Sequence, residues 1–102
     1  MALQEEHEKT ETAFSGTILD VRTQAEFRMA SASGTINIPL QEVQTRLEEI
    51  RNMNAPLLLC CASGNRSGFA EQFLAAQGIP CENIGSWMDV EYYLKQLESE
   101  SC

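Results

Sequence analysis

An apolar run that ends abruptly in cysteine is the feature that most restricts how this sequence can fold. Residues 57–60, Leu-Leu-Leu-Cys, show no alternation of apolar and polar side chains, as expected of a strand buried on both faces of a parallel sheet. A short polar loop, residues 61–66, follows with one glycine and a closing arginine, and a helical pattern begins at once. A thiol held by such a loop faces backbone N–H groups and the positive end of a helix dipole. These conditions favour a thiolate and a site for an anion.

Strand and helix patterns alternate along the rest of the chain. Thr23 and Glu26 form a capping box that opens the first helix, and Gly78 suits the end of the third. The alternation predicts an α/β fold, a small domain with a mostly parallel central sheet flanked by helices. Ligands bind such sheets at the carboxyl ends of the strands, where the loop lies. Strands are predicted at residues 17–21, 35–38, 57–60 and 81–84, and helices at 23–29, 39–52, 66–77 and 88–98.

Helical spacing also predicts which side chains face the core. The chain of 102 residues is long enough for one domain, which we assign to residues 1–102, with the glutamate-rich residues 1–15 as a loose N-terminal arm. The predicted core positions of the last three helices are Leu40, Val43, Leu47 and Ile50, then Phe69, Phe73 and Leu74, then Val90, Tyr93, Leu94 and Leu97.

The acidic composition restricts the partners of the protein. Fifteen acidic residues against seven basic ones give a net charge of -8, which disfavours binding to nucleic acid and to an anionic membrane surface. An anion site must therefore be positive locally. No apolar run approaches the ~18 residues that a membrane span needs, and the N-terminus lacks the pattern of a signal peptide. We therefore expect a cytoplasmic protein.

The four cysteines do not form the pattern of a disulfide framework or a zinc site. Cys60 and Cys61 are adjacent, Cys81 lies near a predicted strand edge, and Cys102 is the last residue. Adjacent cysteines rarely form a disulfide with each other, and the one histidine, His7, is far from them in the sequence. We expect no metal site and no cofactor.

Four sequence blocks together resemble one family. They are residues 18–23 (ILDVRT), 26–27 (EF), 34–40 (GTINIPL) and 61–67 (CASGNRS). In order and spacing they are similar to those of single-domain rhodaneses. The resemblance implies a rhodanese-like fold and a sulfurtransferase. Such an enzyme takes sulfane sulfur from a small donor such as thiosulfate, holds it as a cysteine persulfide and passes it to cyanide, a thiol or a protein thiol partner.

The resemblance implies roles for individual residues. Cys61 aligns with the nucleophile that carries the persulfide. Helix-start N–H groups lower the pKa of a cysteine, and Gly64 allows a tight turn or a positive φ angle. Arg66 can hold an anionic donor or support the loop. The predicted substrate-binding residues are Ala62, Ser63, Gly64, Asn65, Arg66 and Ser67.

Two alternative functions remain open from the sequence. Counted from Cys60, the loop has the Cys-x5-Arg-Ser pattern of cysteine-dependent phosphatases, although burial in a core strand is the expected role of Cys60. A rhodanese-like domain can also serve as an interaction or regulatory module without turnover. Asp20, Arg22 and Glu26 are conspicuous charged residues that we expect to support the structure rather than to react, with Arg22 paired to Glu26.

Overall fold

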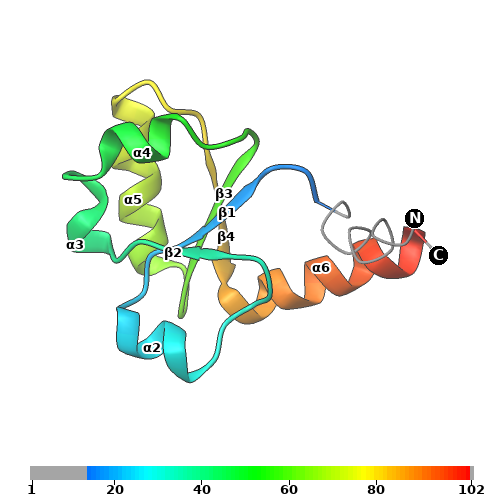
Figure 1. Ribbon diagram of the computed structural model, residues 1–102. Helices are drawn as coiled ribbons and strands as arrows, with labels where there is room; N and C mark the ends of the chain where they lie inside the picture. Colours follow the sequence, from blue (N-terminus) through cyan, green and yellow to red (C-terminus); the bar gives the residue numbers. More distant parts are fainter. Residues whose placement is uncertain (1–13, 102) are drawn as a thin grey trace, which may run out of the picture.

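A computed structural model describes residues 14–101 of the chain, so the predicted arm falls almost wholly outside the described residues, as do His7 and Cys102. The centre of the fold is a four-stranded sheet (Figure 1) in the order β2-β1-β3-β4. All neighbouring strands run parallel. The predicted α/β fold with a parallel sheet is confirmed. The strands are β1 (Thr17–Asp20), β2 (Ile36–Asn37), β3 (Leu57–Cys61) and β4 (Glu82–Ser86).

Helices connect successive strands and cover both faces of the sheet. Helices α3, α4 and α5 lie on one side of the sheet and α6 on the other, while α2 lies at the edge where β1 and β3 end (Figure 1). Among residues 14–101, no helix is long and apolar enough to cross a membrane. The helices are α2 (Gln24–Met29), α3 (Leu40–Val43), α4 (Leu47–Arg51), α5 (Asn65–Ala76) and α6 (Trp87–Ser101).

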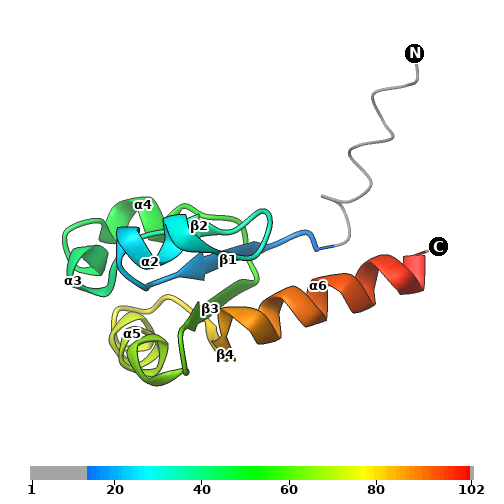
Figure 2. The ribbon, with the colours of Figure 1, turned by 90° about the horizontal axis from the view of Figure 1, so that it is seen from below.

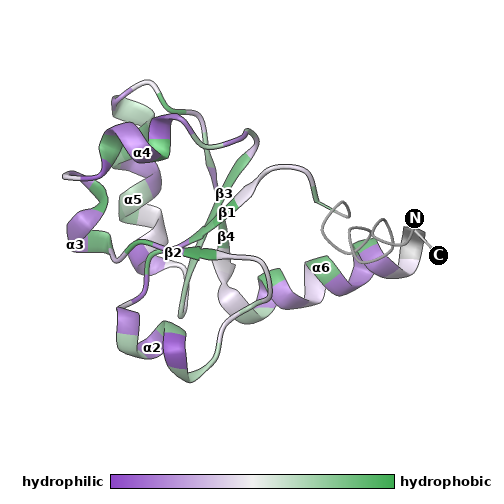
Figure 3. Cartoon of the chain, viewed as in Figure 1, coloured by the Kyte–Doolittle hydropathy of each residue, from purple (hydrophilic) through white to green (hydrophobic). Residues whose placement is uncertain are grey.

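Two hydrophobic clusters lie on opposite faces of the sheet, because successive side chains of a strand point to opposite sides. Leu57, Leu59 and Cys61 belong to the cluster beneath α3, α4 and α5. Leu58 and Cys60 belong to the cluster beneath α6. Figure 3 shows the resulting pattern, with a hydrophobic sheet centre and helices that alternate hydrophilic and hydrophobic residues. The two adjacent cysteines are therefore directed into different parts of the core.

The prediction of one continuous helix over residues 39–52 is wrong. The segment forms two short helices, α3 and α4, separated by a turn. In that turn the Thr45 hydroxyl donates a hydrogen bond to the main-chain oxygen of Glu42, a side-chain interaction that competes with regular helix bonding. Arg46 then leaves helical geometry, with φ -111° and ψ 28°. The predicted core face is confirmed, because Val43 and Ile50 are buried and Leu40 and Leu47 pack against them.

One predicted core residue of α5 is instead on the surface. Phe69 is 66% exposed, whereas Ala70 and Leu74 are fully buried and Phe73 packs partly against the core. Ser67 is also buried, and Ser67, Ala70 and Leu74 follow helical spacing along one face of α5. The inward face thus begins at Ser67. The capping box at Thr23 is confirmed, as is the helix end at Gly78, where φ is +81°.

Helix α6 packs against the sheet through two of its predicted core residues. Val90 is fully buried, and Leu94 packs partly against the same cluster. The prediction that Tyr93 faces the core is wrong, because the residue is 37% exposed, and its ring instead meets that of Phe14 edge to face, with centroids 6.2 Å apart. Helix α6 therefore anchors the start of the described chain next to the sheet.

Candidate active site at Cys61

Cys61 is the last residue of β3, at the carboxyl edge of the sheet. Residues 62–64 form the turn, and α5 begins at Asn65. Figure 2, the view from below, shows α2, α5 and the start of α6 arranged around this end of the sheet. Gly64 has φ +99° and a Cβ there would lie 3.3 Å from the Cα of Gly85. The turn therefore requires glycine for its backbone conformation as well as for space.

Hydrogen-bond donors converge on the sulfur of Cys61. The Sγ atom lies 3.0 Å from the N–H nitrogen of Gly64, 3.4 Å from that of Ser67 and 3.3 Å from the Ser67 hydroxyl. Burial acts to raise the pKa of the Cys61 thiol, but hydrogen bonds from Ser67, Ser63 and Gly64 outweigh it and hold that pKa below its ordinary value. Donors that favour the charged form are the expected cause of an acidic thiol. The loop therefore favours a thiolate at Cys61.

Cys60 has the opposite environment. Its side chain is fully buried in the cluster beneath α6. Burial, together with the nearby charge of Asp20, raises the pKa of the Cys60 thiol to about 12. The expected structural burial of Cys60 is confirmed, and its sulfur lies on the face of the sheet away from α5. A Cys-x5-Arg phosphate loop built on Cys60 has no support in this geometry.

Arg66 joins the first turn of α5 to α2. Its guanidinium binds both carboxylate oxygens of Glu26, at 2.7 and 3.0 Å. Glu26 also completes the capping box by accepting a hydrogen bond from the Thr23 N–H at 2.9 Å. The hydrogen bonds from Arg66 and from Thr23 lower the pKa of Glu26 to about 2. Arg66 thus fixes the end of the loop, and its charge is already balanced by a carboxylate.

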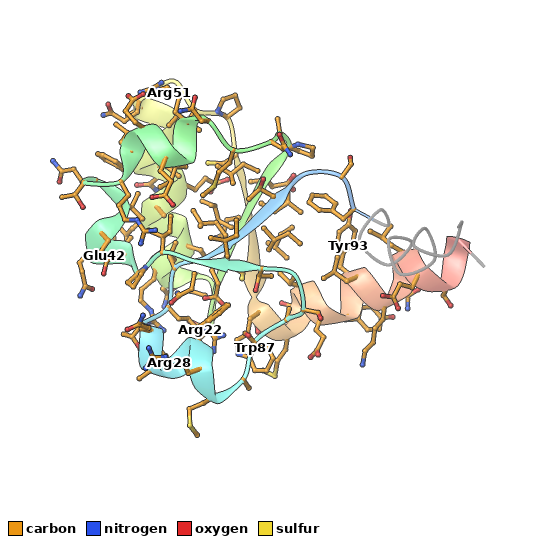
Figure 4. The ribbon with its side chains drawn as sticks, in the orientation of Figure 1. Arg22, Arg28, Glu42, Arg51, Trp87 and Tyr93 are labelled. Carbon is orange, nitrogen blue, oxygen red and sulfur yellow. The ribbon has the colours of Figure 1, made fainter. Side chains whose placement is uncertain are left out.

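The expected pairing of Arg22 with Glu26 is wrong. The Arg22 guanidinium instead forms a buried ion pair with Asp20, with Nη2 2.8 Å from Oδ2, and it donates to the main-chain oxygen of Ala30 at 2.8 Å. It also stacks 4.9 Å from the ring centre of Trp87 (Figure 4). The physical reason is that the guanidinium turns back along the end of β1, away from the Glu26 carboxylate. Of the atoms of Glu26, its main-chain oxygen is the one in contact with Arg22, at 3.5 Å. Arg22 therefore ties β1 to α2 and to the start of α6.

A residue that the sequence did not single out also supports the loop. The Asn83 side chain accepts from the Ser67 hydroxyl at 2.7 Å and from the Gly85 N–H at 3.0 Å. It donates to the main-chain oxygen of Gly64 at 3.0 Å. The only signal in the sequence is an amide side chain within a predicted strand, where a partly buried polar group needs partners. Asn83 thus links β4 to both ends of the loop.

A comparison with family models decides the relationship. The model of the rhodanese-like domain matches residues 2–90, most of the chain. The chain belongs to the rhodanese-like family.

Curated and solved members of the family agree. A putative sulfur carrier protein of Bacillus subtilis, YrkF, is 38% identical over 71 residues, which are 70% of this chain and 38% of that protein. The thiosulfate sulfurtransferase PspE of Escherichia coli is 32% identical over 74 residues, 71% of each chain. A solved structure titled "rhodanese with anions from E. coli" is 30% identical, with a TM-score of 0.63, and the match covers 74% of this chain and 91% of that one. The chain thus spans well under half of YrkF.

In this rhodanese-like domain, some of the predicted site residues contact the Cys61 sulfur and others make different contacts. Gly64 and Ser67 donate to Cys61, Ser63 helps to lower the pKa of the Cys61 thiol, and Arg66 binds Glu26. Ala62 lies in the turn, and Asn65 is the first residue of α5. Within residues 14–101, no group of three His, Cys, Asp or Glu side chains could hold a metal ion. The arrangement can hold a thiolate with neutral donors, and it leaves the neighbouring arginines paired.

Proposed function

We propose that the protein is a sulfurtransferase in which Cys61 carries sulfane sulfur as a persulfide. The observation that carries the proposal is the convergence of the Gly64 N–H, the Ser67 N–H and the Ser67 hydroxyl on one sulfur. Such donors stabilise the thiolate, which is the nucleophilic form of cysteine. Membership of the rhodanese-like family and the names of two relatives, a putative sulfur carrier and a thiosulfate sulfurtransferase, support the same chemistry.

The reaction has two steps. In the first, the Cys61 thiolate attacks the outer sulfur of a donor such as thiosulfate, a Cys61 S–S bond forms, and the donor S–S bond breaks so that sulfite leaves with the electron pair. In the second, cyanide or a thiolate attacks the outer sulfur, and the Cys61 thiolate is regenerated as the leaving group. Charge is conserved in each step. A covalent intermediate of this kind gives ping-pong kinetics.

The confined position of the sulfur favours a small reacting atom. Cys61 is 1% exposed, and the donors from Gly64 and Ser67 surround its sulfur. A terminal sulfane sulfur presents a single atom to such a site, whereas a phosphoryl group presents three oxygens. We therefore propose Ala62, Ser63, Gly64, Asn65, Arg66 and Ser67 as the residues around the bound donor, with Arg66 acting mainly on the shape of the loop.

The experiment that tests this function is intact-protein and peptide mass spectrometry after incubation with thiosulfate or with an alkyl persulfide. The expected result is a gain of about 32 Da, one sulfur atom, on Cys61, and release of thiocyanate when cyanide is added. Cys61→Ala should abolish both results. Cys60→Ala, the matched control in the same strand, should retain them if circular dichroism shows that it is folded.

Three outcomes would overturn the proposal. If Cys61→Ala retains the sulfur gain and folded Cys60→Ala loses it, the sulfur carrier is Cys60 and the proposal names the wrong thiol. Failure of both donors to add sulfur to the wild-type chain would favour a non-catalytic interaction module. Hydrolysis of an aryl phosphate that depends on Cys60 would favour a phosphatase.

A further inference from the structure

The Ser67 hydroxyl has two acceptors and one proton. It lies 3.3 Å from the Cys61 sulfur and 2.7 Å from Oδ1 of Asn83, and both lengths suit a hydrogen bond. A serine hydroxyl can donate only once. Ser67 is fully buried, which leaves its proton to these two acceptors.

The orientation of the Asn83 amide is fixed by its other contacts. Its Nδ2 donates to the Gly64 oxygen at 3.0 Å, and its Oδ1 accepts from the Gly85 N–H at 3.0 Å. The reversed amide would set two acceptors against each other at Gly64 and two donors against each other at Gly85. The atom that faces Ser67 is therefore an oxygen, which can only accept.

We propose that Asn83 is a positioning residue for the site, which competes with the Cys61 sulfur for the Ser67 proton and holds that proton whenever the sulfur is uncharged. This inference rests on the proposed role of Cys61 as the sulfur carrier. With a neutral thiol, the S–H can donate to the Ser67 oxygen while Ser67 donates to Asn83. With a thiolate, Ser67 turns its proton to the sulfur, which is the stronger acceptor because it is charged.

The same exchange follows sulfur transfer. Once Cys61 carries an outer sulfur, its own sulfur has two covalent bonds and no charge, so it accepts a hydrogen bond weakly. Ser67 then donates to Asn83, and the hydroxyl retains a partner although it is buried. Asn83 therefore stabilises the states in which the Cys61 Sγ atom itself is uncharged, relative to the thiolate. These states are the thiol and the persulfide, in which the negative charge lies on the outer sulfur.

The charged groups around the site do not change in this exchange. The hydrogen bond from the Asn83 main-chain N–H to Glu71 does not involve the Asn83 side chain, and the other charged groups keep the contacts described above. These groups are Asp20 and Arg22 at the end of β1, Glu26 on α2, Arg66 and Glu71 on α5, and Asp89, which accepts from the Ser86 N–H at the start of α6.

The test is the ultraviolet absorbance of the Cys61 thiolate, recorded against pH and corrected with Cys61→Ser. It needs no sulfur donor, so it remains informative if the proposed transfer activity is absent. Asn83→Leu removes the competing acceptor, and we expect the thiolate fraction at the acid end of the titration to rise roughly two- to tenfold, the range set by one ordinary hydrogen bond. Asn83→Val, which suits a strand, gives the same test if the leucine variant does not fold.

Ser67→Ala is the matched variant that separates positioning from simple support of the loop. It should lower the thiolate fraction, and Asn83→Leu should have no further effect on the fraction in the Ser67→Ala background. If Asn83 only supported the loop, Asn83→Leu would lower the thiolate fraction in the same direction as Ser67→Ala. That result, an unchanged titration, or an equal effect in both backgrounds would overturn the inference.

Discussion

Removal of the Arg22 side chain should destabilise the protein far more than removal of an exposed arginine. Arg22 and Asp20 are 5% and 0% exposed at their side chains. In Arg22→Ala the Asp20 carboxylate loses three hydrogen bonds from the guanidinium, at 3.0, 3.1 and 2.8 Å, and keeps the main-chain N–H of residue 22 at 3.0 Å. Breaking a buried pair by removing one partner costs about 3–5 kcal/mol. A protein of ordinary stability has about 5–15 kcal/mol in total.

The measurement is urea unfolding of the full chain, with thermal unfolding beside it. A loss of this size in a domain of this length lowers Tm by roughly 12 °C or more. The matched control is Arg51→Ala, because the Arg51–Glu48 pair is exposed, at 41% and 80%, and such pairs contribute less than about 1 kcal/mol. An Arg22→Ala loss as small as that of the control would refute the reasoning.

The same variant tests whether Arg22 supports the structure or acts on the substrate. At a temperature where Arg22→Ala is folded, a supporting role predicts that sulfur transfer per folded molecule stays near the wild-type rate. A folded variant that no longer forms the Cys61 persulfide would assign Arg22 to the reacting site. Replacing both charges, as in Asp20→Leu with Arg22→Met, should recover part of the lost stability because neither charge is then buried without its partner.

Two further variants test the loop and its ion pair. Glu26 has a pKa of about 2 in the folded protein against an ordinary 4.5, so its contribution to stability is present above pH 4.5 and is lost as the pH falls toward 2. Glu26→Gln should therefore lower the free energy of unfolding by less than about 1 kcal/mol at neutral pH, since the pair is partly exposed. Urea unfolding should show that this difference from wild type vanishes near pH 2. A difference that stays constant with pH would contradict the ion pair as its cause. Gly64→Ala places a side chain at φ +99° and should lose about 1–2 kcal/mol together with most thiocyanate formation. Gly78→Ala, at φ +81° with open space around it, should lose stability but keep activity, and equal activity in the two variants would exclude a role of the Gly64 N–H.

The sequence predicted the sheet because its strongest patterns are local ones. The apolar run at 57–60 and the alternation of strands and helices reflect burial, which the residue types express directly. The break after Val43 was not predictable from the same patterns, because Leu40, Val43, Leu47 and Ile50 keep helical spacing across it. The break depends on a side-chain contact of Thr45 and on the geometry of Arg46, which periodicity does not record.

The sequence predicted only the part of the candidate site that lies within one continuous segment. The loop from Cys61 to Ser67 is continuous in sequence, so its N–H groups and glycine could be expected from local chemistry. The pairing of Arg66 with Glu26 joins residues 40 positions apart and depends on where α2 lies against the sheet. Arg22 has two acidic residues near it in the sequence, Asp20 and Glu26, and their spacing alone did not decide between them. Asn83 lies 16 residues from Ser67, and only the pairing of β3 with β4 brings them together.

The opposite directions of Cys60 and Cys61 have a consequence for how the protein withstands oxidation. Cys60 cannot reach across the strand to attack an oxidised or persulfidated Cys61. Cys81 precedes β4 and lies level with Leu57, since Glu82 is paired with Leu58, so it is about 13 Å from Cys61 at ~3.3 Å per residue, beyond the reach of a disulfide. Among the described residues, then, no thiol can resolve Cys61 from within. A thiol that reduces an oxidised Cys61 must therefore come from outside these residues.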